Sequence, residues 1–252
     1  QRGGPGLGTI QPSQGDYFQA CKGGAHGDFH LIVLAPNSVQ EMHDFVGLAF
    51  DLAFKYRNPA IILADGVIGQ MMEKVVLPEQ RPRLTNEEVM ARCPWATFGK
   101  LKHRGPNIVT SLELDPAEME KRNIHLQQKY AEIEEKEVRY EEIHCDDAEY
   151  LIVAFGSCAR IAQKAMEEAR AEGIKVGLLR PITLWPFPSK AIAERSRQVK
   201  GILTVELNAG QMVEDVRLAV ECKVPVEYFG RLGGIVPDPD EVVTALKEKI
   251  IK

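Results

Sequence analysis

Cysteine is scarce in this sequence of 252 residues, and none of its five cysteines forms a Cys-x-x-Cys pair. A zinc site or an all-cysteine iron–sulfur site within the chain is therefore not expected. His26, Asp28 and His30 would share one face of a strand, but glycine-flanked histidines are more typical of polar hydrogen-bonding residues. We predict no metal ligand in this chain and reduced thiols, as in a cytoplasmic protein.

Long apolar runs and an excess of basic charge are also missing. No stretch approaches the roughly 18 apolar residues that a membrane-spanning helix needs, and the first residues lack the basic start and apolar core of a secretory signal. Lysine and arginine number 31 against 36 acidic residues, which gives a net charge of −5. We expect neither a membrane nor a nucleic acid as a partner.

The region from 148 to 252 alternates between short apolar runs and helical patterns. Strands are predicted at 149–156, 174–181, 201–207 and 225–230, and helices at 157–173, 188–198, 210–222 and 238–251. Ser157 is the predicted cap of the first of these helices and Gly173 its end. Such alternation is typical of a doubly wound α/β domain with a parallel sheet.

Residues 1–80 carry a less complete pattern of the same kind. The runs "FHLIVLAP" and "AIILAD" favour two buried strands, and between them Ser38 and Glu41 form the capping box of a helix. Since a parallel sheet of two strands cannot stand alone, we expect further strands from residues upstream of this sequence. The region 81–147 is rich in proline and charge, and we predict a connection with a long exposed helix over 115–146.

Three short motifs stand out between the predicted elements. The opening "QRGGPGLGTIQPSQGD" is neither a Walker A loop nor a dinucleotide fingerprint, and its glycines suit a loop with positive φ angles. Arg2 adds a guanidinium that can grip a carboxylate with two parallel hydrogen bonds. "LRPITLWPFP" places Trp185 and Phe187 on a rigid proline scaffold, so we expect both to pack on the first domain or on a partner. "VELNAGQ" puts polar groups where a strand passes into a helix.

Together with "LAPNSVQEMHD", these motifs resemble, in order, the α subunits of 2-oxoacid:ferredoxin oxidoreductases. The opening motif is most similar to the 3-methyl-2-oxobutanoate (2-ketoisovalerate) type. The resemblance covers essentially the whole chain. It implies the end of a thiamine-diphosphate pyrimidine-type domain over 1–80, the connecting segment over 81–147 and a transketolase C-terminal-like domain over 148–252.

The family oxidatively decarboxylates a 2-oxoacid to an acyl-CoA and passes electrons to ferredoxin. The resemblance implies thiamine diphosphate with Mg²⁺ held mainly by a β subunit, CoA as cosubstrate, and iron–sulfur clusters on other subunits. It assigns Arg2, Gly3, Gly4 and Thr9 to substrate binding, and Gln14 and Asp16 to a loop near the cofactor. The glutamate that activates the cofactor belongs to an upstream segment of about a hundred residues, the size of a small domain, so no catalytic residue is named here.

Two other functions stay open from the sequence. One is an assembly subunit with a degenerate active site, for which the acidic helix and the "LWPFP" turn would be the important surfaces. Another is a member of the same family that uses 2-oxoglutarate or pyruvate. A generic nucleotide-binding α/β protein fits the motifs poorly. Activity alone is not expected of this chain without its partner subunits.

Overall fold

The computed structural model describes residues 1–251 apart from positions 98, 100, 101 and 103. These four lie in the predicted connection, whose structure at those positions is outside the described residues. The chain divides into two compact units, one formed by Gln1–Val75 with Lys129–Lys252 and the other by Val76–Gln128. The boundaries 80/81 and 147/148 stay a prediction.

The larger sheet has five strands in the order β3-β5-β4-β7-β8. Their bounds are β3 (Tyr140–Ile143), β4 (Tyr150–Ala154), β5 (Val176–Pro181), β7 (Ile202–Glu206) and β8 (Val226–Gly230). The four predicted strands are all present and pair in parallel, whereas β3 pairs antiparallel to β5 and was not predicted. The expected α/β fold class is confirmed.

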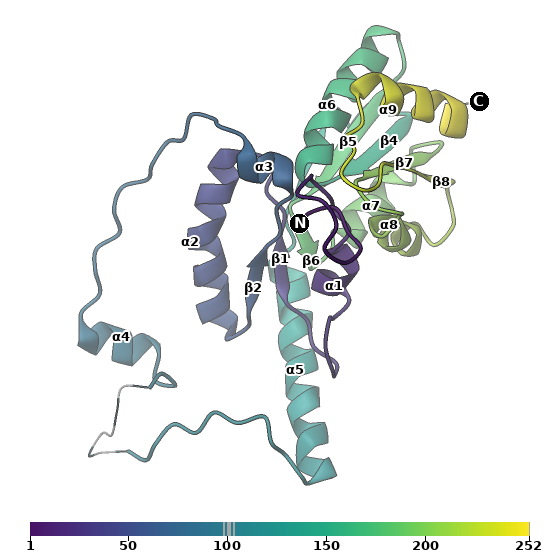
Figure 1. The fold of residues 1–252 in the computed structure, drawn as a ribbon. Coiled ribbons are helices and arrows are strands. Elements are labelled where there is room, and N and C mark those ends of the chain that lie inside the picture. Colours follow the sequence, from purple (N-terminus) through teal and green to yellow (C-terminus); the bar gives the residue numbers. More distant parts are fainter. Residues whose placement is uncertain (98, 100–101, 103, 252) are drawn as a thin grey trace. The chain divides into compact units, whose positions relative to one another are not determined.

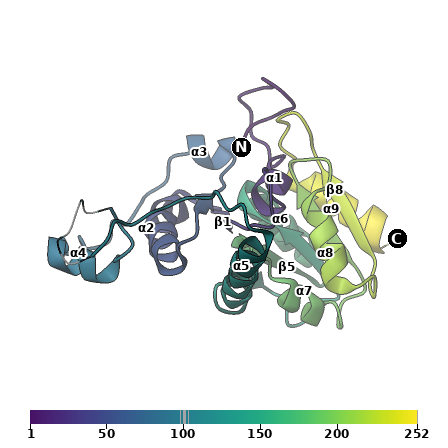
Figure 2. The ribbon, with the colours of Figure 1, turned by 90° about the horizontal axis from the view of Figure 1, so that it is seen from below.

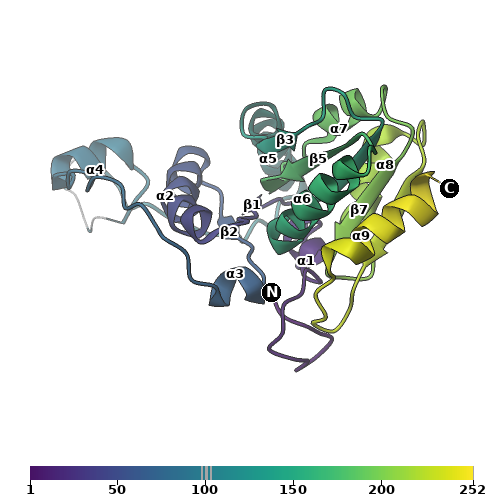
Figure 3. The same ribbon diagram turned by 90° about the horizontal axis from the view of Figure 1, so that it is seen from above.

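Helices cover both faces of this sheet, as Figures 1 and 3 show. On one face lie α6 (Gly156–Ala171) and α9 (Pro239–Leu246), and on the other α7 (Ser189–Arg195) and α8 (Met212–Val220). The chain ends in a turn of π-helix, Lys247–Ile251. Because α6 faces the sheet with small residues such as Ala159, Ala162 and Ala169, helix and strands pack closely into one buried core.

The start of α6 lies close to the predicted position, but the predicted capping residue is wrong. Ser157 lies inside the helix, its N-cap is Phe155, and no side chain of the cap residue bonds there. The N–H of Ser157 instead donates to the carboxylate of Asp65, 3.1 Å away. The predicted end is confirmed, because Gly173 has a φ of 87° and donates its N–H to Arg170 at 2.9 Å.

A second sheet has the strand order β2-β1-β6. Here β1 (Ile32–Leu34) pairs in parallel with β2 (Ala60–Ile62) and antiparallel with β6 (Thr183–Trp185). Among the described residues, the "LRPITLWPFP" motif provides the third strand, and the further strands expected from upstream residues stay a prediction. Helix α2 (Val39–Tyr56) begins at the predicted cap, with Ser38 Oγ accepting the N–H of Glu41 at 3.1 Å. The capping box is only half formed, because the Glu41 carboxylate accepts the N–H of Asn37 at 2.9 Å and not that of Ser38.

Trp185 of the aromatic motif packs inside this chain. Trp185 is 7% exposed, and its ring stacks on His30 at 4.7 Å and meets the edge of Tyr130 at 5.6 Å. His30 lies in a loop, not on a strand, and its pKa is lowered by burial. Phe187 is only half-buried, so its role as a partner contact stays a prediction.

The predicted helix over 115–146 is shorter than expected. It is α5 (Pro116–Lys136), and the chain then turns into β3. Its last turns bury Tyr130 and Ile133, so this end packs in the core while the rest is largely exposed. Elsewhere α1 (Tyr17–Cys21), α3 (Gly66–Gln70) and α4 (Asn86–Arg92) are short. No helix of the described residues is long and apolar enough to cross a membrane.

Two buried ionic groups connect segments that are far apart in the sequence. Arg180 is 4% exposed; its two terminal nitrogens donate to Glu41 at 2.8 Å each, and its Nε donates to Glu141 at 2.8 Å. The first contact ties the larger sheet to α2 through a bidentate pair.

The second ionic group is the carboxylate of Glu137, which is 4% exposed. It accepts hydrogen bonds from Lys55 at 2.6 Å, Tyr56 at 2.7 Å and Arg139 at 2.9 Å. Burial alone would raise its pKa, but these donors outweigh burial and lower the pKa of Glu137 to about 2. The group thus links the end of α2 to the end of α5 as a carboxylate.

Candidate functional site

The opening loop is fastened to the carboxyl edge of the larger sheet by Gln14. This side chain is fully buried. Its Nε2 donates to the carbonyl of Phe155 at 2.8 Å, its Oε1 accepts the N–H of Leu207 at 3.1 Å, and its own N–H donates to Leu207 at 2.8 Å. Gln14 thereby joins the loop to the chain that leaves β4 and β7, and its side chain is occupied by structural contacts.

The "VELNAGQ" motif also hydrogen-bonds the end of the opening loop, around Gln14. Asn208 Nδ2 donates to the carbonyl of Gln14 at 2.8 Å. Gln211 Nε2 donates to Gly15 at 2.9 Å, and its Oε1 accepts the N–H of Phe18 at 2.9 Å. The two motifs were noticed separately in the sequence, and the structure brings them together.

Glu206, from the same motif, is buried at the start of α8. Its carboxylate accepts the N–H groups of Gln211 (3.2 Å), Met212 (2.7 Å) and Val213 (3.0 Å). Burial raises the pKa of Glu206 and these three N–H groups act against that shift. The side chain of Asn208 also hydrogen-bonds this carboxylate and lowers its pKa, so the described contacts of Glu206 hold the start of α8 and the "VELNAGQ" turn together.

Asp65 was not noticed in the sequence and proves central to this edge. It is 3% exposed; one carboxylate oxygen accepts the N–H groups of Val67 and Ile68 at the start of α3, and the other accepts that of Ser157 at the start of α6. An aspartate that follows a buried strand and precedes a helix is a typical N-cap, and that signal could have identified the first of these roles.

Beyond Gln14, the loop folds back on itself over residues 2–12. Arg2 and Pro12 form an antiparallel bridge, the N–H of Gly3 donates to Gln11 at 2.8 Å, and the N–H of Thr9 donates to Gly3 at 2.8 Å. Gly8 has a φ of 55°, and a Cβ there would overlap the carbonyl oxygen of Gly3. Glycine is needed at position 8 for both reasons.

The guanidinium of Arg2 is exposed and donates only to the carbonyl of Leu7 in its own loop. Among the described residues, no carboxylate pairs with it. Asp16 is exposed at the start of α1. Leu7 and Ile10 are 89% and 80% exposed. The tip of the loop therefore presents a cation with unused donors, together with apolar side chains that none of the described residues covers.

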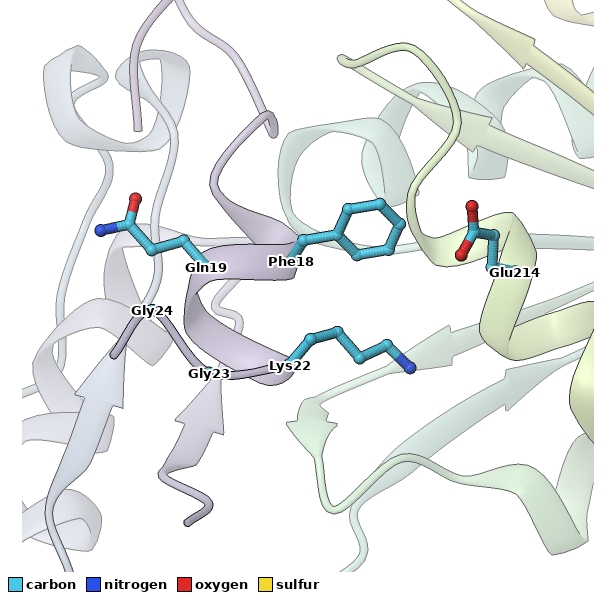
Figure 4. Close-up of a pocket in the computed structure, with 6 residues that line it drawn as sticks. All are labelled: Phe18, Gln19, Lys22, Gly23, Gly24 and Glu214. Atoms are coloured by element: carbon cyan, nitrogen blue, oxygen red, sulfur yellow. The ribbon is translucent and has the colours of Figure 1, made fainter. Parts of the chain in front are cut away.

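A pocket of about 500 Å³ lies between α1 and α8, lined by Phe18, Gln19, Lys22, Gly23, Gly24 and Glu214. In Figure 4 the side chains of Phe18 and Lys22 extend toward α8, whereas Gln19 points away. Lys22 already pairs with Asp215, which also accepts the hydroxyl of Tyr17 at 2.6 Å. Because this cation is neutralised, the pocket suits an anion less well than the tip of the opening loop does.

The thiols do not assemble into a site. All five cysteines are free, and only Cys222 is exposed. Burial raises the pKa of Cys158 at the start of α6, and chiefly burial raises that of Cys145 to about 11. In the described part of the chain, no three His, Cys, Asp or Glu side chains are grouped to hold a metal ion.

Known proteins resemble this chain over its length. A family model described as pyruvate flavodoxin/ferredoxin oxidoreductase, thiamine diphosphate-binding, matches residues 1–143, and one described as pyruvate:ferredoxin oxidoreductase core domain II matches 148–242. The ketoisovalerate oxidoreductase subunit VorB of Methanothermobacter marburgensis is 49% identical over 98% of this chain and 68% of its own length. The 2-oxoglutarate synthase subunit KorA of the same organism is 32% identical over 98% of this chain and 71% of its own.

Among solved structures, 2-oxoglutarate:ferredoxin oxidoreductase from Magnetococcus marinus matches 98% of this chain with a TM-score of 0.77 and 24% identity. This chain spans about half of that protein, 47% of its length. At this identity the match supports the fold. The sequence matches carry the assignment, and they confirm the resemblance of the motifs: the chain belongs to the 2-oxoacid:ferredoxin oxidoreductase family.

Proposed function

We propose that the chain is part of the α subunit of a thiamine-diphosphate-dependent enzyme that oxidatively decarboxylates a branched-chain 2-oxoacid to an acyl-CoA and passes the electrons to ferredoxin. The observation that carries the proposal is the 49% identity with ketoisovalerate oxidoreductase subunits. The 2-oxoglutarate synthase subunits are 32–34% identical, which favours the branched-chain substrate over 2-oxoglutarate.

The tip of the opening loop is the proposed substrate end of the site. A 2-oxoacid is an anion, and Arg2 offers exposed donors in a fork that matches a carboxylate. Gly4 has nothing within 4 Å of where a Cβ would stand, so a ligand could approach its backbone closely. Gly3 and Thr9 are committed to the loop's internal contacts, and we propose that they support the substrate through the shape of the loop.

Thiamine diphosphate supplies the nucleophilic carbon and the electron sink for decarboxylation when it is bound. The described residues fit only part of this cofactor's site. Apolar Leu7 and Ile10 beside Arg2 suit an interface that closes over a ligand and excludes water. The donor set offers no metal-binding cluster among the described residues, so we place Mg²⁺ and the diphosphate on a β subunit. Gln14 would fix the loop near the cofactor, with exposed Asp16 at its edge.

The proposed partners are that β subunit, iron–sulfur subunits of the same complex and ferredoxin, in the cytoplasm. The exposed apolar tip of the opening loop supports a partner at this edge. None of the five cysteines lies in a Cys-x-x-Cys pair, which supports placing the clusters on other chains.

The test is a panel of 2-oxoacids on the full-length complex, with CoA and a viologen as electron acceptor. We expect the highest kcat/KM for 3-methyl-2-oxobutanoate. A higher kcat/KM for 2-oxoglutarate or pyruvate would contradict the branched-chain assignment alone. A correctly assembled complex that contains thiamine diphosphate but turns over no 2-oxoacid would contradict the enzymatic proposal and favour an assembly role.

A further inference from the structure

The loop between β8 and α9, residues 231–238, lies beside the opening loop in all three views (Figures 1, 2 and 3). Thr9 Oγ1 donates to the carbonyl of Gly233 at 3.2 Å. A Cβ on Gly3 would stand 3.0 Å from that carbonyl, and a Cβ on Gly234 would overlap the Cβ of Gln11. The side chains of Thr9 and Gln11 thus pack directly on the backbone of Gly233 and Gly234, and there is no room for a Cβ on Gly3 or Gly234.

The residues of the opening loop that contact the second loop are also the residues that fix the position of Arg2. Gly3 follows Arg2 directly, and its N–H is held by Gln11 while its carbonyl accepts the N–H of Thr9. Each of these three residues also lies against Gly233 or Gly234. Arg2 itself has no contact with the second loop among those described, so any influence on its guanidinium passes through its neighbours.

The second loop is itself held firmly by the C-terminal domain. Arg231 donates its N–H to the carbonyl of Glu206 at 3.3 Å and its guanidinium to Glu241 at 2.7 Å. At the other end, Asp238 and Glu241 form a capping box that starts α9. A loop fixed at both ends can serve as a rigid support for the glycine-rich loop that packs on it.

We propose that residues 231–238 are a positioning element for the substrate, with Gly234 as the residue that permits the close packing that presents Arg2. The inference rests on the proposed role of Arg2 in binding the 2-oxoacid carboxylate. It assigns to the C-terminal domain a part in substrate binding that the opening motif alone would not reveal.

Gly234→Ala in the full-length complex tests the proposal. Gly234 has a φ of 102°, so alanine is strained there and its Cβ must displace Gln11. Because a shift of about 1 Å in a positioning contact can cost up to a hundredfold, we expect the KM for the 2-oxoacid to rise about ten- to a hundredfold while the KM for CoA stays unchanged. Trypsin should also cleave after Arg2 faster than in the wild type.

Gly173→Ala is the matched control. Gly173 also has a positive φ, 87°, but a Cβ there would meet nothing within 4 Å, so this variant should lose stability without a change in KM. Adding Gln11→Gly to Gly234→Ala removes the colliding Cβ and should recover part of the KM, even if strain at position 234 remains.

A double-mutant cycle with Arg2→Ala separates this inference from the proposed function. We expect Gly234→Ala to have little further effect once Arg2 is alanine, because both changes act on the same contact. If Arg2→Ala lowers kcat/KM while Gly234→Ala does not, or if the two effects multiply, the positioning role is wrong and the function stands. If Arg2→Ala is silent, both are overturned.

Discussion

Replacing Glu41 by alanine removes the carboxylate that binds the buried guanidinium of Arg180 at both terminal nitrogens. The Arg180 side chain is 4% exposed and that of Glu41 is 23% exposed, so water cannot easily replace the lost partner. Two charge-assisted hydrogen bonds of 2.8 Å disappear, and the guanidinium keeps only Glu141. We therefore expect a large loss of folding free energy and a weakened link between α2 and the larger sheet.

The expected size follows from the burial of the pair. Removing one partner of a buried ion pair typically costs about 3–5 kcal/mol, and we take the lower end, about 3 kcal/mol, because Glu41 is partly exposed. For a chain of this size each kcal/mol lowers Tm by roughly 2–4 °C, so Tm should fall by about 6–12 °C. Calorimetry or circular dichroism on the full-length subunit measures it.

Glu141→Ala is the matched control, because it removes the other carboxylate from the same guanidinium. The Glu141 side chain is 45% exposed, and a pair that water can reach is worth at most about 1 kcal/mol. Glu41→Gln keeps an oxygen for the N–H of Asn37, which Glu41 accepts at 2.9 Å, and should fall between the two. Equal losses for Glu41→Ala and Glu141→Ala would refute the reasoning from burial.

Four further outcomes are expected. Arg2→Lys in the assembled enzyme keeps the positive charge but loses the two parallel hydrogen bonds of the guanidinium, so kcat/KM for the 2-oxoacid should fall roughly ten- to a hundredfold while the affinity for thiamine diphosphate stays unchanged. An unchanged kcat/KM in Arg2→Ala would show that Arg2 does not bind the substrate. Gly156→Ala should lower the free energy of unfolding by about 1–3 kcal/mol, because Gly156 has a φ of 57° and a Cβ there would stand 2.9 Å from the buried side-chain amide of Gln14. Urea unfolding of this variant, compared with Gly173→Ala, would show whether the close contact adds to the backbone strain. Glu137 has a lowered pKa of about 2 in the folded state, so the stability that it contributes is complete above its unfolded pKa and is lost as the pH falls toward 2. Glu137→Gln should therefore flatten the fall in stability between about pH 5 and pH 2. Acid-unfolding curves of the variant and the wild type that run parallel would contradict this. Cys222 should be the one thiol that reacts quickly with a bulky thiol reagent in the native protein, because it is the exposed one of the five, and fast labelling of a second thiol by mass spectrometry would disagree.

Local signals in the sequence predicted the elements whose causes are local. The cap at Ser38 and the end at Gly173 depend on residues three or four positions away, and both are confirmed. The alternation of apolar runs and helices predicted the parallel strands of the larger sheet for the same reason. These features needed no knowledge of what lies across the fold.

The errors concern partners that are distant in the sequence. The start of α6 is capped by Asp65, which lies 92 positions before Ser157, and nothing near Ser157 indicates this. Strand β6 has three residues and looks like an aromatic turn until β1 is placed beside it. For the candidate site, Arg2 and its glycines were noticed, but the support by Gly233 and Gly234 depends on a contact across more than two hundred residues.

The strand β6 also bears on how the chain is made. Its partner β1 is synthesised before it, and the antiparallel pairing between Leu34 and Thr183 can form only after β6 has been made. At about 5–20 residues per second, that interval lasts roughly 7–30 s. During this time β1, whose three residues are fully buried in the folded chain, lacks its β6 partner on one edge. Protection by chaperones would therefore matter more for the segment that contains β1 than for β4, β5 and β7, which follow one another closely and pair in parallel.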